Sequence, residues 1–95
     1  MLTESARLLS QGPREARKIY EKLLAGSRNV RFSDLCKIAE AFGYRLDRVS
    51  GSHHIYEHPA ATRPLNLQTD RGQAKPYQIR QFLRDVEEFR LTLKD

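Results

Sequence analysis

The feature that most constrains the fold is a change in the spacing of hydrophobic residues along the chain. From Phe32 to Gly43, and again from Tyr77 to Phe89, apolar residues recur every three or four positions, as on one face of a helix. Between these segments apolar and polar residues alternate, which is typical of strands with one buried face. This order predicts an α+β domain, with antiparallel strands and helices packed on one face of the sheet.

Two of the expected helices carry recognisable end signals. Ser33 is a suitable N-cap for the helix that starts near Phe32, and Gly43 is expected to end it in a left-handed conformation. Pro76 suits the first turn of the last helix. The apolar residues of the last helix fall on one face, and they are Ile79, Phe82, Leu83, Val86 and Phe89.

A further helix is expected upstream, from Arg14 to Ala25, with Pro13 in its first turn and Gly26 as its stop. The apolar residues on one face of this helix are Ile19, Tyr20, Leu23 and Leu24. We expect this face to be buried, either on the same domain or on a partner chain, because four exposed apolar side chains would be costly.

Three short strands are expected between the helices. In residues 44–49, Tyr44 and Leu46 share one face, and a Ser-Gly-Ser turn leads into residues 53–58. Leu65 and Leu67 point inward in the third strand. Residues 69–76 are expected to form a polar connection.

Composition limits the classes of protein to which the chain can belong. Its 95 residues suffice for one domain, or for one domain with an appendage, and the net charge of +5 weakly favours a polyanionic partner. There is no apolar run long enough to cross a membrane, and we expect no secretion signal. The single cysteine, Cys36, excludes an internal disulfide framework and is expected to be a small buried residue. We therefore expect a cytoplasmic protein that does not associate with a membrane.

Two adjacent histidines, His53 and His54, follow directly after Gly51 and Ser52. Histidine titrates near neutral pH, so it can transfer protons or bind a metal, and it can also be an ordinary surface residue. In a strand the two side chains point to opposite faces, so they should not share one task.

A metal site is the alternative use of these histidines, and it is not expected. His54 with His58, or His53 with Glu57, would have to chelate the ion, but strand positions four apart lie about 13 Å from each other. That separation is too large for one zinc ion with bonds of about 2 Å. His58 is expected to be a solvated residue at the end of its strand.

The segments GYRLDRVSGSHHIYEHP and GQAKPYQIRQFLRDV resemble the HicA family of bacterial toxins. The resemblance covers Phe32 to Phe89, and its most specific element is the glycine-serine-histidine turn that leads into a strand. It implies a fold like a double-stranded-RNA-binding domain, helix–β–β–β–helix, here with an extra N-terminal helix. The expected division is a helical extension over residues 1–31 and a HicA-like domain over residues 32–95.

The same resemblance implies a metal-independent endoribonuclease that uses no cofactor. Such an enzyme cuts mRNA through a histidine and is neutralised by a HicB-type antitoxin, with which it can form a hetero-oligomer. Two departures favour an alternative, a non-catalytic RNA-binding or protein-interaction module with the same fold. About 30 residues precede the matched region, and LNLQTD stands where many members have a Pro-Val-His-like stretch.

The resemblance concentrates the expected active site at the turn. His53, which matches the glycine-serine-histidine pattern, is slightly favoured as the catalytic residue, and His54 is kept beside it. The expected RNA-binding residues are Gly51, Ser52, Arg48, Tyr56, Lys75, Tyr77 and Arg80. Lys75 and the start of the last helix could hold a phosphate, because a helix start carries partial positive charge. Tyr56 could stack on a base.

Overall fold

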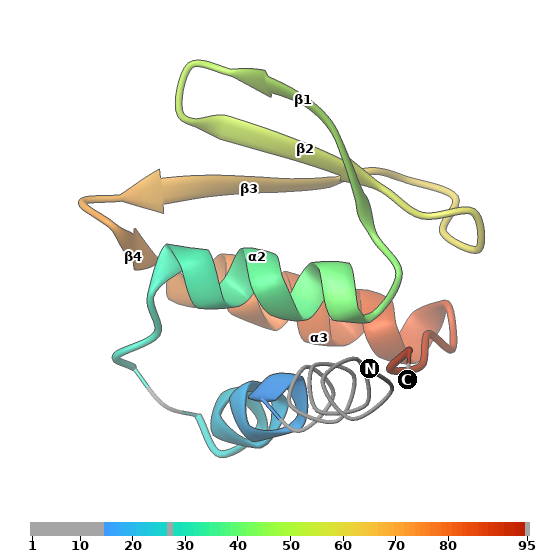
Figure 1. Cartoon of the computed structure of the whole chain (residues 1–95), viewed down its shortest axis with the longest axis horizontal. Helices are drawn as coiled ribbons and strands as arrows, with labels where there is room; N and C mark the ends of the chain where they lie inside the picture. The colour runs from blue at the N-terminus through green and yellow to red at the C-terminus, as the bar shows by residue number, and fades with distance from the viewer. Residues whose placement is uncertain (1–14, 27, 95) are drawn as a thin grey trace, which may run out of the picture.

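A four-stranded antiparallel sheet carries α2 and α3 on one of its faces (Figure 1). The computed structural model describes residues 15–26 and 28–94. A helical segment over residues 15–24 comes first and lies beneath α2 and α3, on their side away from the sheet. The elements that follow are α2 (Phe32–Ala41), β1 (Arg45–Ser50), β2 (His53–Glu57), β3 (Leu65–Asp70), β4 (Gln73–Ala74) and α3 (Pro76–Glu88). The predicted α+β class and the helix–β–β–β–helix order are confirmed.

The strands follow one another across the sheet in the order β1-β2-β3-β4. In the central pair, His54 lies opposite Leu67 and Tyr56 lies opposite Leu65. Tyr56, Leu65 and Leu67 are buried towards the helices, as the alternating pattern predicts. The residues between them therefore face outward, and this outer face carries His53 and Asn66.

The fourth strand replaces part of the polar connection expected over residues 69–76. Asp70 pairs with Gln73, so Arg71 and Gly72 form a two-residue hairpin loop. Both have positive φ, 55° for Arg71 and 80° for Gly72, as this hairpin turn requires. Arginine is not typical of such a position, and the sequence pattern therefore did not reveal the hairpin.

The core lies between the inner face of the sheet and the helices. Its buried side chains are Ala16, Ile19, Leu23, Val30, Leu35, Ile38, Ala39, Phe42, Tyr44, Tyr56, Leu65, Leu67, Ala74, Ile79, Phe82, Val86 and Leu91. Leu46 is not among them, since 47% of its surface is exposed. It lies on the edge strand β1, where the register shifts between Leu46 and Arg48. β1 is exposed along its whole length.

The helical segment over residues 15–24 packs on its own domain. Ala16, Ile19 and Leu23 join the core, and the ring of Tyr20 meets that of Phe42 at 5.0 Å. Leu24, in contrast, is 59% exposed, so the predicted apolar face is displaced towards Ala16. The predicted start of this helix, at residues 13 and 14, lies outside the described residues. The division of the chain at residue 31 stays a prediction.

The ends of α2 agree only in part with their sequence signals. Arg31, not Ser33, is the N-cap of α2, and it makes no side-chain capping hydrogen bond. The start is fixed instead by a bridge between Arg31 and Gln73 of β4. Gly43, with φ of 100°, ends the helix as predicted. Pro76 lies in the first turn of α3, also as predicted.

No helix in residues 15–26 and 28–94 is long and apolar enough to cross a membrane.

The Tyr44 hydroxyl is a titratable group buried in the core without a hydrogen-bond partner among the described residues. Burial, reinforced by the nearby charge of Asp85, raises the pKa of Tyr44 to about 12. In the unfolded chain a tyrosine titrates near pH 10, so this neutral phenol stabilises the fold fully below that pH. The contribution is lost as the pH rises from about 10 through about 12.

We predict that the free energy of unfolding falls between pH 9 and pH 12, and that Tyr44→Phe reduces the fall by about 2–3 kcal/mol. Urea unfolding of both proteins across this range measures the difference. Other groups also titrate there, and the comparison with Tyr44→Phe removes their contribution. Parallel stability curves for the two proteins would contradict the assignment.

Candidate functional site

The two adjacent histidines lie on opposite faces of β2. His53 is exposed on the outer face, and it pairs with Gln68 of β3. His54 is half-buried on the inner face, where its ring meets that of Phe32 edge-on at 4.9 Å. The Nδ1 atom of His54 is buried and has no partner among the described residues. Of the two, His53 is the more exposed.

The ring of His53 is held by the neighbouring strand. Its Nδ1 atom lies 3.1 Å from the side-chain Oδ1 of Asn66 on β3. An amide oxygen only accepts hydrogen bonds, so the Nδ1–H of His53 donates to it. In the neutral ring this leaves the lone pair on Nε2, the nitrogen that can take up a proton.

A chain of polar side chains connects this position with the start of α3. Gln68 lies directly opposite His53, and its Nε2 donates to the hydroxyl of Ser52 at 3.1 Å. The ammonium of Lys75 donates to Oε1 of the same Gln68 at 3.4 Å. The turn, the third strand and the residue before α3 are thereby held together, and the ammonium of Lys75 contacts the residue that pairs with His53.

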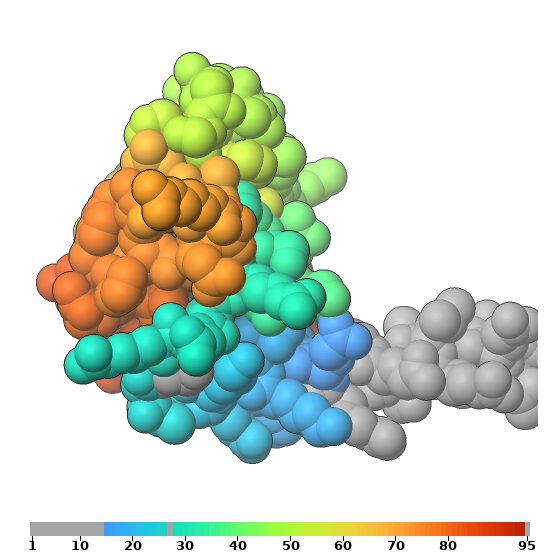
Figure 2. Space-filling view, turned by 90° about the vertical axis from the view of Figure 1, so that its left-hand side faces the viewer, coloured from blue at the N-terminus to red at the C-terminus, as the bar shows by residue number. Residues whose placement is uncertain are grey.

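These segments share one end of the molecule. Figure 2 views that end, where the β1–β2 turn lies above the β3–β4 hairpin and the beginning of α3. Gln78 ties the helix to the sheet, because its buried Oε1 accepts a hydrogen bond from the backbone N–H of Gln68 at 2.9 Å. Lys75 is the N-cap of α3, and its backbone carbonyl accepts hydrogen bonds from the N–H groups of Gln78 and Ile79 in the first turn.

Two further predicted residues lie near the same turn. Gly51 has φ of 61°, a conformation that other residues adopt with strain, so its role in the turn is explained. Arg48 pairs with Ile55, which places it on the outer face with His53. Its guanidinium lies 2.5 Å from the carboxylate of Asp47, so part of its charge is already compensated.

The other predicted RNA-binding residues are distributed differently. Tyr56 is 2% exposed on the inner face, and its hydroxyl donates to Glu40, which leaves no ring face for a base. Tyr77 is exposed, and its ring lies 6.0 Å from the ammonium of Lys75. Arg80 lines a groove between α3 and the helical segment over residues 15–24, away from the histidine turn.

Three polar residues of this site were not identified from the sequence, namely Asn66, Gln68 and Gln78. The alternation of the strand was a usable signal for Asn66 and Gln68. Because Leu65 and Leu67 point inward, their neighbours in the strand must point outward. Pairing this strand with residues 53–57 would have placed Asn66 and Gln68 beside His53. The contact of Gln78 depends on how α3 packs on the sheet, which no local pattern reveals.

Comparison with protein families gives one match. Residues 32–87 match the family described as the HicA toxin of bacterial toxin–antitoxin. The chain belongs to the HicA family. Neither the curated proteins nor the solved structures include one that matches it. Membership makes it a toxin of a toxin–antitoxin pair and implies an antitoxin partner.

The region matched to the HicA family contains His53, the polar chain through Gln68 to Lys75, and nearly all of α3. The helical segment over residues 15–24 precedes it. In this HicA chain the segment lies on the side of α2 and α3 away from the sheet (Figure 1).

The third histidine of the HicA chain, His58, has a structural role. Its Nε2–H donates to the backbone carbonyl of Phe42 at 2.9 Å, and its Nδ1 accepts from the backbone N–H of Ala60 at 2.9 Å. His58 is half-buried, so the prediction that it is solvated holds only in part. A Cβ atom on Gly43 would lie 2.8 Å from His58 Nε2, so a glycine is needed for this close approach.

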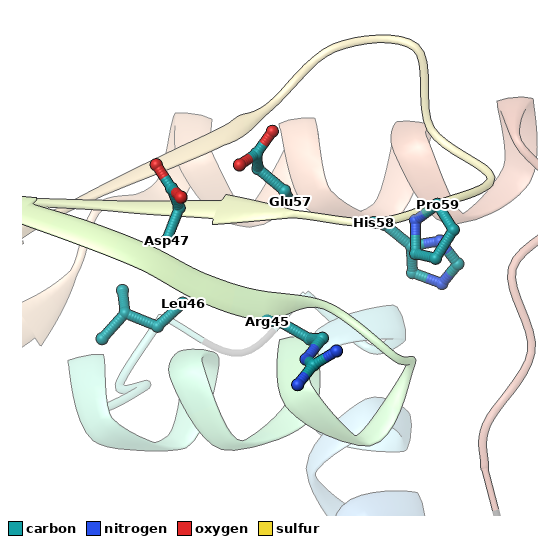
Figure 3. A pocket seen from close by; sticks show the side chains of 6 residues that line it. All are labelled: Arg45, Leu46, Asp47, Glu57, His58 and Pro59. Atoms are coloured by element: carbon teal, nitrogen blue, oxygen red, sulfur yellow. The ribbon is translucent and has the colours of Figure 1, made fainter.

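His58 also lines an open pocket between β1 and β2, which Figure 3 shows. Asp47 and Glu57 project from one side of the two strands, and Arg45 projects from the other. Within the described part of the chain, no group of three histidine, cysteine or acidic residues is placed to hold a metal ion.

Cys36 lies in a second groove, beneath β2, together with Phe32 and His54. It is half-buried, not fully buried as expected, and this burial raises the pKa of its thiol. A raised pKa keeps the thiol protonated and unreactive at neutral pH. The groove therefore contains no activated nucleophile at this position.

We predict that His58→Ala destabilises the HicA fold by about 1–3 kcal/mol, because two hydrogen bonds are lost and the Phe42 carbonyl loses its imidazole donor. Urea unfolding measures the effect. His53→Ala is the matched control, since its exposed ring makes one hydrogen bond to another exposed side chain, and its stability should change by less than about 0.5 kcal/mol. Equal losses in the two variants would contradict the structural role of His58.

Proposed function

We propose that this HicA-family toxin is a metal-independent endoribonuclease that cuts mRNA in the cytoplasm, with His53 as its catalytic residue. Its activity is neutralised by a HicB-type antitoxin. The observation that carries the proposal is the environment of His53. Its ring is exposed, its Nδ1–H is engaged with Asn66, and its Nε2 is left to accept a proton. A lysine and two polar side chains accompany it.

Cleavage through the ribose 2′-hydroxyl needs a base at the attacking oxygen. In the proposed reaction Nε2 of His53 takes the 2′-hydroxyl proton, and the bond between O2′ and phosphorus forms. The bond between phosphorus and O5′ then breaks, and O5′ leaves with a proton from water. The products are a 2′,3′-cyclic phosphate and a 5′-hydroxyl, and no metal or redox partner is required.

Water is assigned as the acid because neither of the other two histidines shares the outer, exposed position of His53. His54 faces the inner groove, and His58 has both ring nitrogens in hydrogen bonds to backbone groups. The sequence also lacks the second histidine that many family members carry after the third strand. A single imidazole therefore has to serve as base and, after proton transfer, as imidazolium near the phosphate.

Phosphate stabilisation is assigned to Lys75 and the first turn of α3. A charge at this position offsets the negative charge that develops on the phosphate in the transition state. The dipole of α3 adds partial positive charge at its start. Gln68 positions Lys75 through one hydrogen bond of 3.4 Å, and Gln68 is itself held by its hydrogen bond of 3.1 Å to Ser52. A HicB-type antitoxin would neutralise the toxin by covering this outer face.

The proposal is tested by comparing His53→Ala with His54→Ala on a defined RNA. Loss of the base should reduce cleavage by about 10²–10⁴-fold in His53→Ala. His54→Ala is the matched control and should retain cleavage, because its ring lies on the opposite face. Products of the wild type should carry a 2′,3′-cyclic or 3′-phosphate, and a chelator should leave the rate unchanged.

Two results would contradict this assignment. Full cleavage by a folded His53→Ala protein would exclude His53 as the base. Binding of RNA by the wild type without any cleavage would replace the enzyme with the alternative, a non-catalytic RNA-binding module of the same fold.

A further inference from the structure

We propose that Asn66 is a positioning residue that fixes the tautomer of His53, so that the basic nitrogen of its ring faces the RNA. The inference rests on the proposed cleavage at His53. Its structural basis is the contact of 3.1 Å between Oδ1 of Asn66 and Nδ1 of His53. Asn66 acts through the histidine and is not assigned a contact with the substrate.

The location of Asn66 favours a functional role over a structural one. Asparagine is disfavoured in strands, yet it stands here between two fully buried leucines, Leu65 and Leu67. Its own side chain is exposed on the outer face, so it contributes little burial. Asn66 pairs with Ile55, which places it diagonally across from His53, within reach of the imidazole.

The chemistry of the amide oxygen determines what the contact does. It can only accept, so it holds the proton on Nδ1 and leaves Nε2 unprotonated. His58 shows the opposite arrangement in the same chain, because its Nε2–H donates to Phe42 and its Nδ1 accepts from Ala60. In both cases the protein group beside the ring sets which nitrogen carries the proton.

An amide also suits a polyanionic substrate better than a carboxylate in this position. An aspartate would accept the same hydrogen bond, but it would place a negative charge next to the RNA phosphate. Asn66 orients the ring without that repulsion. The positive charge of Lys75, held by Gln68 on the same strand, is then not neutralised locally.

The test combines a direct measurement of the tautomer with kinetics on the full chain. Nitrogen-15 NMR of the His53 ring should show the Nδ1–H form in the wild type and a shift towards the Nε2–H form in Asn66→Leu. The same variant should lose about tenfold to 100-fold in kcat, less than the loss expected when the base itself is removed, with KM little changed. Asn66→Asp should keep the tautomer and most of kcat, and should raise KM through its charge.

Gln73→Leu is the matched control, because it replaces another exposed strand amide, on β4, with the same apolar residue. It should change neither the tautomer nor kcat. An unchanged His53 tautomer in Asn66→Leu would overturn the role proposed for Asn66. It would leave the proposed cleavage at His53 standing if the enzyme is active. A changed tautomer with unchanged kcat would also overturn it. A wild type that shows the Nδ1–H form but cuts no RNA would instead overturn the proposed function, and the catalytic role of Asn66 with it.

Discussion

The pairing of β2 with β3 is the interaction on which the rest of the molecule depends. Its register sets Tyr56 opposite Leu65 and His54 opposite Leu67, so one face of the pair is apolar and is covered by the helices. The same register brings His53 beside Asn66 on the other face. A slip of one residue would exchange the two faces and would destroy the core and the candidate site together. Stability and function are therefore specified by one set of contacts.

The second constraint is the attachment of α3 to the edge of β3. β4 is only two residues long and pairs with only part of β3. At Gln68 the side-chain oxygen of Gln78 accepts the backbone N–H in place of a strand partner. This buried amide fixes the first turn of α3 against the sheet, and Lys75 precedes that turn. The position of Lys75 at the helix start is thus set by a hydrogen bond in the interior.

Much of the fold could be predicted because hydrophobic spacing is a local signal. The alternation of Leu65 and Leu67 predicted their burial, and the helical spacing around Phe82 predicted α3. Leu46 follows the same alternation but lies on an edge strand with a register shift, where the helices do not cover it. The pattern reports which face a residue is on, and it does not report whether another element covers that face.

The candidate site was predictable only in part. The Gly-Ser-His turn identified His53, and strand geometry correctly separated it from His54. The roles of Asn66 and His58 depend on partners that are distant in sequence, one on β3 and the other the backbone of Phe42. Such contacts arise from strand register and from the close approach at Gly43. They become visible only when the tertiary structure is known.

The central claim, that the outer face of β2 and β3 binds RNA around His53, is tested most directly by NMR mapping on the full chain. A labelled protein would be titrated with an RNA whose 2′-hydroxyls are replaced by hydrogen, so that it binds but cannot be cut. Our account predicts that backbone signals change at Ser52, His53, Gln68 and Lys75. Changes confined to the inner groove around Cys36, or to the helical segment over residues 15–24, would contradict it.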